Sequence, residues 1–399
     1  MSKLIITRWK GSVLTLLHSG KEAVQIHIES EESQCVLGNI YIGKVNKIVK
    51  NINAAFVDMG QGQMGYLSLG DGMVHHADGR LSDGKLRQGD EIIVQVERDA
   101  VKSKAPVLTG NLNITGRYFV LTSGKKQIGF SSKITDQAWK LKMKSQLEAV
   151  KGENFGIIVR TNAPGASEEE LQKELQSLIH TLNKLFEEAR YRTCYSLLYS
   201  AAPSYLSGLR DSLKSTLEAV ITDEPDIYEA VKSYLVQNQP EDLNLLVLYE
   251  DKLLPLSKLY RIDKTMEEAL GKRVWLKSGG YLVIEPTEAL TVIDVNTGKY
   301  SGKKELRDTI MKINLESAEE IGHQLRLRNL SGIIIIDFID MAFEEDKNRL
   351  VARLTDILSK DPVKTTVVEI TKLNLVEVTR KKIRKPLHEQ VSQLSQERV

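Results

Sequence analysis

Two apolar runs that each end on an aspartate constrain the fold of this chain more than any other sequence feature. Residues 289–294 read ALTVID, and residues 332–337 read GIIIID. Such runs are typical of buried strands. The stretch between them, KELRDTIMKINLESAEEIGHQLRLR, has helical spacing, and a second helical pattern follows in EEDKNRLVARLTDILSK. This alternation predicts a sheet covered by helices, with ligands expected at the strand ends.

Asp294 and Asp337 are therefore expected to leave the sheet on rigid supports. Two such carboxylates on neighbouring strands can share Mg²⁺, which takes one or two carboxylates, several waters and phosphate oxygens. Mn²⁺ is an expected substitute. Asn296 points to the same side of an extended chain as Asp294 and offers an amide to a phosphate oxygen. In the alternative interpretation these aspartates cap helices or begin turns, and Asp340 is predicted to be an orienting or turn residue.

The bulk composition bounds where the chain works and what it can bind. A length of 399 residues predicts two to four domains. The net charge of +2 means that attraction to a nucleic acid must come from local positive charge. Cys35 and Cys194 form no CxxC pair, which fits a reducing cytosol and no zinc ribbon. The longest aliphatic run, residues 333–336, is far below a membrane span, so we expect a cytoplasmic location.

Short, turn-punctuated strands from Gly38 to about residue 118 predict a small closed barrel of the OB-fold type. Phe56 and Tyr66 lie on successive predicted strands, with Lys102 and Lys104 beyond the following strand. Aromatic faces beside positive charge are typical of RNA-binding surfaces. The alternative is that both aromatics belong to the barrel core.

The block after the barrel mixes strands and helices. The strand FGIIVRT presents the guanidinium of Arg160 and the hydroxyl of Thr161, a pair suited to a phosphate, although a solvated strand end is the alternative. Ser167 and Glu170 form a capping box. It opens a helix with one buried face, which carries Leu171, Leu175, Leu178, Leu182 and Leu185.

Two later segments are also assigned from their patterns. Residues 205–220, YLSGLRDSLKSTLEAV, predict a helix, followed by a strand at 243–251. His323 is predicted to be a packed or surface helix residue and not a metal ligand. The chain closes with a polar tail whose basic residues are interpreted as a solvated helix face with nonspecific attraction to RNA. These are Arg380, Lys381, Lys382, Arg384 and Lys385.

Taken together, the motifs NIYIGKV, AAFVDMG, GYL, IIVRT, SGGYLVIEPTEALTVIDVNTG and NLESAEEIGHQLRLRNLSGIIIIDFIDM resemble the catalytic half of the ribonuclease E/G family. The resemblance runs from about residue 1 to 385 and is densest at 279–341. It implies an α/β multi-subdomain fold. An RNase H-like sheet (1–37 and 204–269) is interrupted by an S1-like OB-fold barrel (38–118) and a 5′-sensor region (119–203). A DNase I-like α/β catalytic subdomain with a basic tail follows (270–399).

The resemblance also implies roles for individual residues. Asp294 and Asp337 become Mg²⁺ ligands, and Asn296 contacts the scissile phosphate. Arg160, Thr161 and the backbone at Val120 would hold a 5′ monophosphate. Phe56, Tyr66, Lys104 and Lys364 would bind RNA.

Two departures from the family pattern bear on assembly and recognition. The region RKKIRKPLHEQVSQL carries no cysteine where family members have a CPxC-type motif, so no zinc and no zinc-linked dimer is expected, while other homo-oligomers stay open. The loop GKKQIGFSSKITD keeps only Lys133 in place of paired arginines, which predicts weaker discrimination of the 5′ end.

The sequence thus predicts a Mg²⁺-dependent endoribonuclease that cuts single-stranded RNA during processing or decay and leaves 5′-phosphate and 3′-hydroxyl ends. One alternative is a noncatalytic RNA-binding factor in ribosome assembly or RNA maturation. A second is a metal-dependent DNA nuclease, which the predicted S1-like barrel disfavours.

Overall fold

The computed structural model divides the chain into two compact units. The first unit comprises Met1–Glu32, Glu218–Ser233 and Asp242–Val399, and the second comprises Ser33–Leu217 and Tyr234–Glu241. The structure describes residues 2–20, 22–29, 37–70, 74–82, 86–98, 105–124, 126–152, 155–211, 217–298 and 306–396.

The first unit contains a five-stranded sheet that joins the start of the chain to its second half. The strand order is β17-β16-β1-β2-β3, with β1 (Ser2–Trp9), β2 (Ser12–Ser19), β3 (Glu22–Glu29), β16 (Leu217–Thr222) and β17 (Leu246–Leu248). Lys10 and Gly11 both have positive φ, as the two-residue turn between β1 and β2 requires. The core between this sheet and its helices includes Ile5, Leu16, Leu256, Met266 and Leu387. Those helices are α5 (Leu256–Leu259), α6 (Ile262–Leu270) and α9 (Leu387–Gln396).

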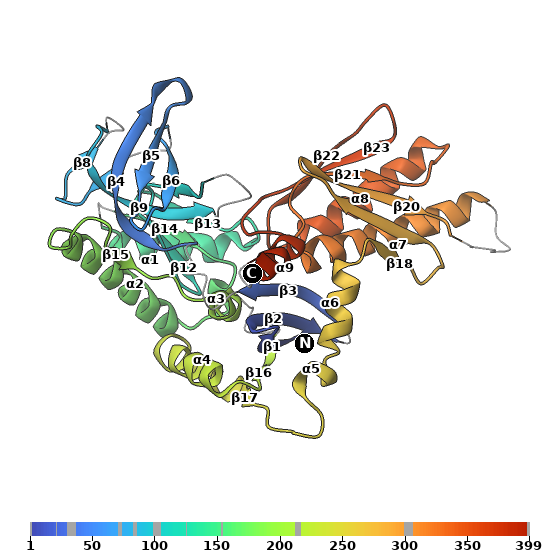
Figure 1. Ribbon diagram of the computed structural model, residues 1–399, viewed down its shortest axis with the longest axis horizontal. Coiled ribbons are helices and arrows are strands. Elements are labelled where there is room, and N and C mark those ends of the chain that lie inside the picture. The colour runs from blue at the N-terminus through green and yellow to red at the C-terminus, as the bar shows by residue number, and fades with distance from the viewer. Residues whose placement is uncertain are drawn as a thin grey trace. The chain divides into compact units, whose positions relative to one another are not determined.

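A six-stranded sheet completes the first unit. Its order is β18-β19-β20-β21-β23-β22, with β18 (Arg273–Trp275), β19 (Tyr281–Pro286), β20 (Leu290–Asn296), β21 (Gly332–Asp337), β22 (Thr365–Ile370) and β23 (Leu375–Arg380). β20 and β21 are parallel and the other neighbours are antiparallel. The connection from β20 to β21 runs through α7 (Leu306–Leu327), and α8 (Glu344–Ser359) follows β21 (Figure 1).

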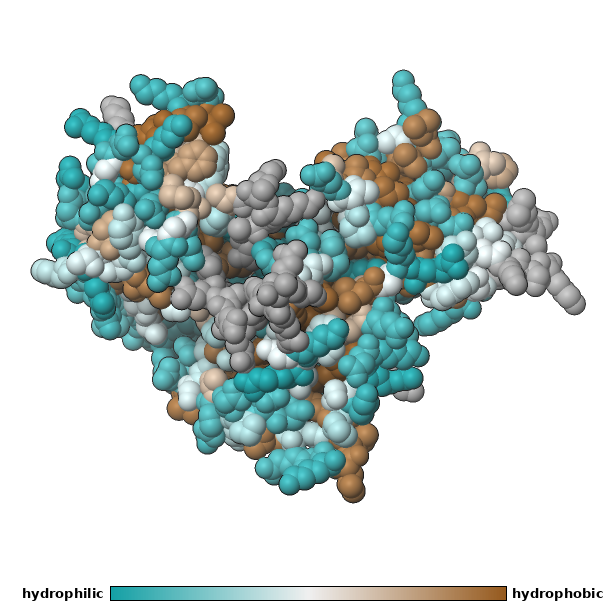
Figure 2. Space-filling model, in the orientation of Figure 1, coloured by the Kyte–Doolittle hydropathy of each residue, from teal (hydrophilic) through white to brown (hydrophobic). Residues whose placement is uncertain are grey.

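This sheet is buried on one face and open on the other. Ile293 and Ile334 point into a core that also contains Ile321 of α7 and Leu354 of α8. The alternating positions point to the other side. Val292 on β20 and Ile333 and Asp337 on β21 are exposed there, and Ile335 is half-buried. Figure 2 shows hydrophobic atoms gathered in the region where Figure 1 places these strands. We call this side, which carries Val292, Asp294, Ile333 and Asp337, the open face.

The second unit contains a closed five-stranded barrel. Its strands are β4 (Ile40–Val49), β5 (Ala54–Asp58), β6 (Met64–Ser68), β9 (Glu91–Arg98) and β10 (Val107–Thr109), and β4 pairs with β9 to close it. The same sheet includes β7 (Val74–His76), β8 (Leu81–Ser82) and β15 (Leu197–Tyr199). Val57, Leu67, Val94 and Leu108 fill the interior. The predicted mixed α/β fold with an OB-like barrel is therefore confirmed.

A four-stranded sheet packs with two helices beside the barrel in the same unit. Its order is β11-β12-β14-β13, with β11 (Asn113–Thr115), β12 (Phe119–Thr122), β13 (Ile128–Phe130) and β14 (Gly156–Val159). The helices are α1 (Gln137–Val150) and α2 (Glu168–Ala189). Both halves of the predicted capping box at Ser167 and Glu170 are formed, and the five predicted leucines of α2 are buried.

Two sequence-based assignments were wrong. The helix predicted at 205–220 ends much earlier, since α3 covers Ser204–Asp211 and residues 217–222 form β16. The sheet partners β1 and β17 override the helical pattern there. The strand predicted at 243–251 is too long, because β17 covers only Leu246–Leu248 and residues 240–245 form a 3₁₀ helix. The tail contains α9, whose Leu387 is fully buried. The remaining elements are α4 (Pro225–Asn238), η1 (Lys50–Ile52), η2 (Ala163–Gly165) and η3 (Pro240–Leu245).

No helix among the described residues is long and apolar enough to cross a bilayer. The RNase H-like and DNase I-like identities of the two sheets in the first unit, and the five subdomain boundaries, stay predictions.

Candidate functional site

Asp294 and Asp337 lie side by side at the ends of two neighbouring parallel strands. They are direct partners in the register of β20 and β21, so their side chains leave the same face of the sheet. Adjacent strands are about 4.8 Å apart. Both side chains are exposed and belong to the open face. We call Asp294, Asp337 and Asp340 the carboxylate edge.

Asn296 shares this face with Asp294 because two residues separate them on an extended strand. Its Nδ2 donates a hydrogen bond of 2.6 Å to Oδ2 of Asp294. The chain turns sharply just beyond, where Gly298 has φ of +61° and a Cβ would lie 2.2 Å from the carbonyl oxygen of Gly279. Only glycine fits this close approach. The turn therefore fixes where β20 ends and where the Asn296 amide lies.

The carboxylate edge accumulates negative charge. Burial raises the pKa of Asp337, and the negative charges of Asp294 and Asp340 raise it further. Like charges at this spacing disfavour ionisation of each other, and a bound cation would remove that penalty. The electrostatics of the edge therefore suit a cation.

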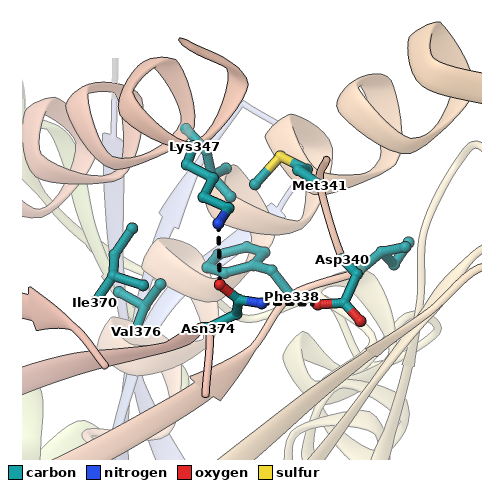
Figure 3. Close-up of a pocket in the computed structure, with 9 residues that line it drawn as sticks. Phe338, Asp340, Met341, Lys347, Ile370, Asn374 and Val376 are labelled. Carbon is teal, nitrogen blue, oxygen red and sulfur yellow. Dashed lines mark hydrogen bonds between the residues drawn. The ribbon is translucent and has the colours of Figure 1, made fainter. Parts of the chain in front are cut away.

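A hydrogen-bonded chain holds Asp340 in place. Nζ of Lys347 donates to Oδ1 of Asn374 at 3.0 Å, and Nδ2 of Asn374 donates to Oδ1 of Asp340 at 3.3 Å. Figure 3 shows these three side chains lining a small pocket together with Phe338. The orienting or turn role predicted for Asp340 is compatible with this geometry, because Asn374 holds its carboxyl group within the carboxylate edge.

Asn314, which the sequence analysis missed, ties the loop after β21 to α7. Its Nδ2 donates to the carbonyl oxygen of Ile339 at 2.8 Å, and its Oδ1 accepts from the Ile339 amide at 3.1 Å. The side chain is fully buried. A polar residue at a core position of the helical pattern was the available signal, since buried amides need partners. Asn314 thus sets the path of the chain between Asp337 and Asp340.

The donor set fits Mg²⁺ better than a cation held by protein ligands alone. Among the described residues, no group of three or more His, Cys, Asp or Glu side chains is arranged to hold a metal. Mg²⁺ needs only one or two carboxylates because water and substrate phosphate complete its coordination. Asp294 and Asp337 meet that requirement.

Phe56 and Tyr66 lie on the outside of the barrel and not in its core. They are direct partners on β5 and β6, and their rings meet edge to face at 6.1 Å between centroids. Their chain neighbours Val57 and Leu67 point inward instead. Lys47 of β4 pairs with Phe56 and is exposed, which adds positive charge to this row. The sequence analysis missed Lys47, and the Lys102 and Lys104 that it proposed lie outside the described residues.

Arg160 lies at the end of β14, with its guanidinium already engaged. It donates to Oδ1 of Asp211 at 2.8 Å and to the carbonyl oxygen of Gly116 at 2.6 Å. Burial by itself would raise the pKa of Asp211, but the guanidiniums of Arg210 and Arg160 hold it below its ordinary value. Arg160 is therefore paired with a carboxylate, shared with Arg210, that no sequence motif indicated.

Thr161 and Val120 flank Arg160. The Thr161 hydroxyl is 3.0 Å from that of Ser131, at the ends of the parallel strands β14 and β13. Val120 lies on β12, opposite Ile158 of β14. The structure thus brings Arg160, Thr161 and Val120 to one small sheet of the second unit.

A half-buried carboxylate sets the position of β12 in this sheet. Glu174 of α2 accepts backbone hydrogen bonds from Arg117, Tyr118 and Phe119 at 2.7, 2.7 and 2.9 Å. A Cβ on Gly116 would collide with this carboxyl group, so glycine is needed there. The Gly116 carbonyl that accepts from Arg160 is fixed as a result.

Other predicted residues lie elsewhere. Lys364 directly precedes β22, whose first residue pairs with Arg380, and Arg380 pairs with Gly332 at the start of β21. Lys364 is therefore at the opposite end of the sheet from Asp337, and its contact with RNA stays a prediction. His323 contacts the carbonyl oxygen of Ala23 through Nε2 at 2.7 Å, which is a packing role.

Arg380 corrects the interpretation of the basic tail as a solvated face. Its side chain is only 2% exposed, and its Nε donates to Asp361 at 2.7 Å. Its Nη1 donates to Asn329 at 2.8 Å. A buried arginine that is paired in this way is not free to attract RNA. Lys381 and Lys382 remain exposed.

Comparison with known proteins identifies the family to which the chain belongs. The sequence model of the Ribonuclease E/G family matches residues 113–383. Ribonuclease G of Haemophilus influenzae is 36% identical over 373 residues, which cover 91% of this chain and 76% of that protein. Ribonuclease G of Escherichia coli (strain K12) is 35% identical with the same coverage. Ribonuclease E of Synechocystis sp. is 33% identical over 98% of this chain and 58% of its own length. The chain belongs to the ribonuclease E/G family.

Proposed function

We propose that this chain is a Mg²⁺-dependent endoribonuclease that cleaves single-stranded RNA in RNA processing and decay. An endoribonuclease of the ribonuclease E/G type follows from family membership. The metal dependence is supported by one observation above all, the direct pairing of Asp294 with Asp337 at the ends of parallel strands. We propose a cytoplasmic location, where single-stranded RNA substrates are available.

Each residue of the site has a role in this proposal. Asp294 and Asp337 would hold Mg²⁺, which when bound stabilises charge on the phosphate and activates the attacking water. Asn296 would donate its amide N–H to a phosphate oxygen. Without RNA, the same amide donates to Oδ2 of Asp294. Water forms a new bond to phosphorus as the bond to the 3′ oxygen breaks. The products are a 5′-phosphate and a 3′-hydroxyl.

The second unit would supply grip and recognition of the 5′ end. Phe56 and Tyr66 would stack on bases, and Lys47 beside them would attract the backbone. We place Lys104 and Lys364 among the RNA contacts as well. Arg160, Thr161 and the backbone of Val120 would hold a 5′ monophosphate and so favour monophosphorylated RNA.

The proposal is tested with a 5′-monophosphorylated, single-stranded RNA carrying an internal label. The wild-type chain should cut it with Mg²⁺ and not with a chelator present, and the products should be ligatable at their 5′ ends. Asp356→Asn, which removes an exposed carboxylate on α8, is the matched control and should retain activity. RNA binding without a Mg²⁺-dependent product would support a noncatalytic RNA-binding factor instead. Faster cleavage of DNA would support a DNA nuclease.

A further inference from the structure

An aromatic and cationic cluster lies on the open face next to the carboxylate edge, and none of the roles assigned above uses it. It consists of Arg273 and Trp275 of β18 and Tyr281 of β19. We propose that this cluster is a stacking platform for one nucleobase of the RNA strand, next to the scissile phosphate. The inference rests on the proposed function, since it concerns the substrate of the same site.

The strand register puts the platform and the carboxylates on one face. Trp275 pairs with Tyr281, and Tyr281 pairs with Asn296. One step along the same face, Arg273 pairs with Val283, which pairs with Asp294. Directly paired residues of antiparallel strands project to the same side. Trp275 is thus two strand spacings, roughly 10 Å, from the strand that carries Asp294 and Asn296.

The rings are exposed and carry a cation. Trp275 is 64% exposed, a large apolar area for an edge-strand residue of a soluble chain. The Trp275 and Tyr281 rings are tilted by 57° with centroids 5.2 Å apart. Arg273 lies over both rings, 4.6 Å from the centroid of Tyr281 and 5.7 Å from that of Trp275. An aromatic face beside a guanidinium is the surface on which single-stranded bases stack while a phosphate is attracted.

The neighbouring hairpin is built to bring this platform close to Asn296. A Cβ on Gly280 would lie 2.8 Å from the carbonyl oxygen of Asn296, so the hairpin between β18 and β19 packs directly on the end of β20. A purely structural reading is that Trp275 and Tyr281 only staple this hairpin, as cross-strand aromatic pairs do. That reading leaves the exposed Trp275 ring and the overlying Arg273 without a reason to be at the edge where the phosphate is expected.

RNA is the occupant that the charges favour. A strand bound at the carboxylate edge must continue past it in both directions, and the open face toward β18 offers the next surface. The negative edge requires a bridging cation for a phosphate, whereas Arg273 offers its own positive charge to the next phosphate or base. The platform would therefore fix the register of the bound RNA strand, and so which phosphodiester bond lies at the carboxylate edge.

The experiment couples a protein mutation to the removal of one base. A set of 5′-monophosphorylated oligoribonucleotides, each with one abasic position, is titrated against the full chain in a chelator, with anisotropy of a 3′ dye as readout. For the wild type, one abasic position should weaken binding about tenfold. In Trp275→Ala, removal of the base at that same position should weaken binding less than twofold. Trp275→Phe, which keeps a ring, should retain most of the penalty.

The control and the contrary outcomes are equally specific. Ile333→Ala removes an exposed apolar side chain from the same face, 51% exposed and away from the edge, and should retain the tenfold penalty. Equal abasic penalties in the wild type and Trp275→Ala would overturn the platform. A change in the light-scattering mass of Trp275→Ala would also overturn it, because the face would then bind a second copy. Absence of Mg²⁺-dependent cleavage by the wild type would refute the nuclease, while the binding cycle still decides the platform.

Discussion

The carboxylate edge of the first unit and the Arg160 cluster of the second unit, which consists of Arg160, Arg210 and Asp211, are both candidate phosphate sites. Their charges are arranged in opposite ways. At the edge, Asp294 and Asp340 add negative charge beside Asp337 and raise its pKa. Around Arg160, two guanidiniums face Asp211 and lower its pKa. Like charges are crowded together at the first site, whereas opposite charges are paired at the second.

This difference indicates what each site needs before it can bind a phosphate. The edge repels a phosphate until a cation is present, so catalysis there depends on the metal, whereas the barrel and the stacking platform are expected to hold the strand without it. Arg160 can attract a phosphate by itself, but Asp211 competes for the same guanidinium. Cleavage at the carboxylate edge is thus expected to require the metal absolutely. Arg160 is expected only to modulate the preference for the 5′ end.

The largest expected effect is the loss of cleavage in Asp294→Asn and in Asp337→Asn. Each change keeps the side-chain shape but removes a charged metal ligand, so cleavage should fall at least about 100-fold. Affinity for RNA in a chelator should stay within about twofold of wild type. The measurement is single-turnover cleavage at saturating RNA. Retained activity in both variants would disprove the metal assignment.

Arg160→Ala should have a smaller, end-specific effect. Loss of a charged hydrogen bond to phosphate should reduce the preference for 5′-monophosphate over 5′-hydroxyl RNA by roughly tenfold. Cleavage of a circular RNA, which has no 5′ end, should be unchanged. Arg192→Ala, an exposed arginine of the same unit, serves as the control. An equal loss on both RNAs would argue against a 5′-end role.

The pH dependence of cleavage should reflect the negative charges that surround Asp337 at the carboxylate edge. Asp337 must be ionised to hold a cation, and its pKa is raised, so activity should decline on acidification at a higher pH than for an ordinary aspartate. Asp340→Asn removes one of the causes and should move that acidic limb to lower pH. Initial cleavage rates from about pH 4.5 to 7.5 at a fixed, subsaturating Mg²⁺ concentration test this, because protons and Mg²⁺ then compete for Asp337. An unmoved limb would assign the titration to another group.

The smallest effects should be shifts of opposite sign in thermal stability. The raised pKa of Asp337 means that its ionised form costs stability as pH rises through that pKa, so Asp337→Asn should raise Tm by about 1–2 °C at neutral pH without metal. The lowered pKa of Asp211 means that its ionised form contributes stability, which is lost as pH falls. Asp211→Asn should therefore lower Tm by about 2–4 °C at neutral pH. Shifts of the same sign would contradict the comparison.

Features set by local pattern could be predicted from the sequence. The strands of Asp294 and Asp337, the buried face of α2 and the closure of a barrel all follow from periodicity and turn residues. Features set by distant partners could not. The strand at 217–222 forms because β1 and β17 flank it, and Arg160 is paired with Asp211 across 51 residues of sequence. Burial of Arg380 likewise depends on Asp361, which no motif marks.

The five-stranded sheet of the first unit has a consequence for synthesis on the ribosome. Strand β1 borders β16, and the whole second unit except its last short segment lies between them in the sequence. The N-terminal hairpin must therefore wait, with one edge unpaired, while residues 33–217 emerge and fold around their own core. The first unit begins first and is completed last, so an incomplete nascent chain lacks the paired strands that carry Asp294 and Asp337.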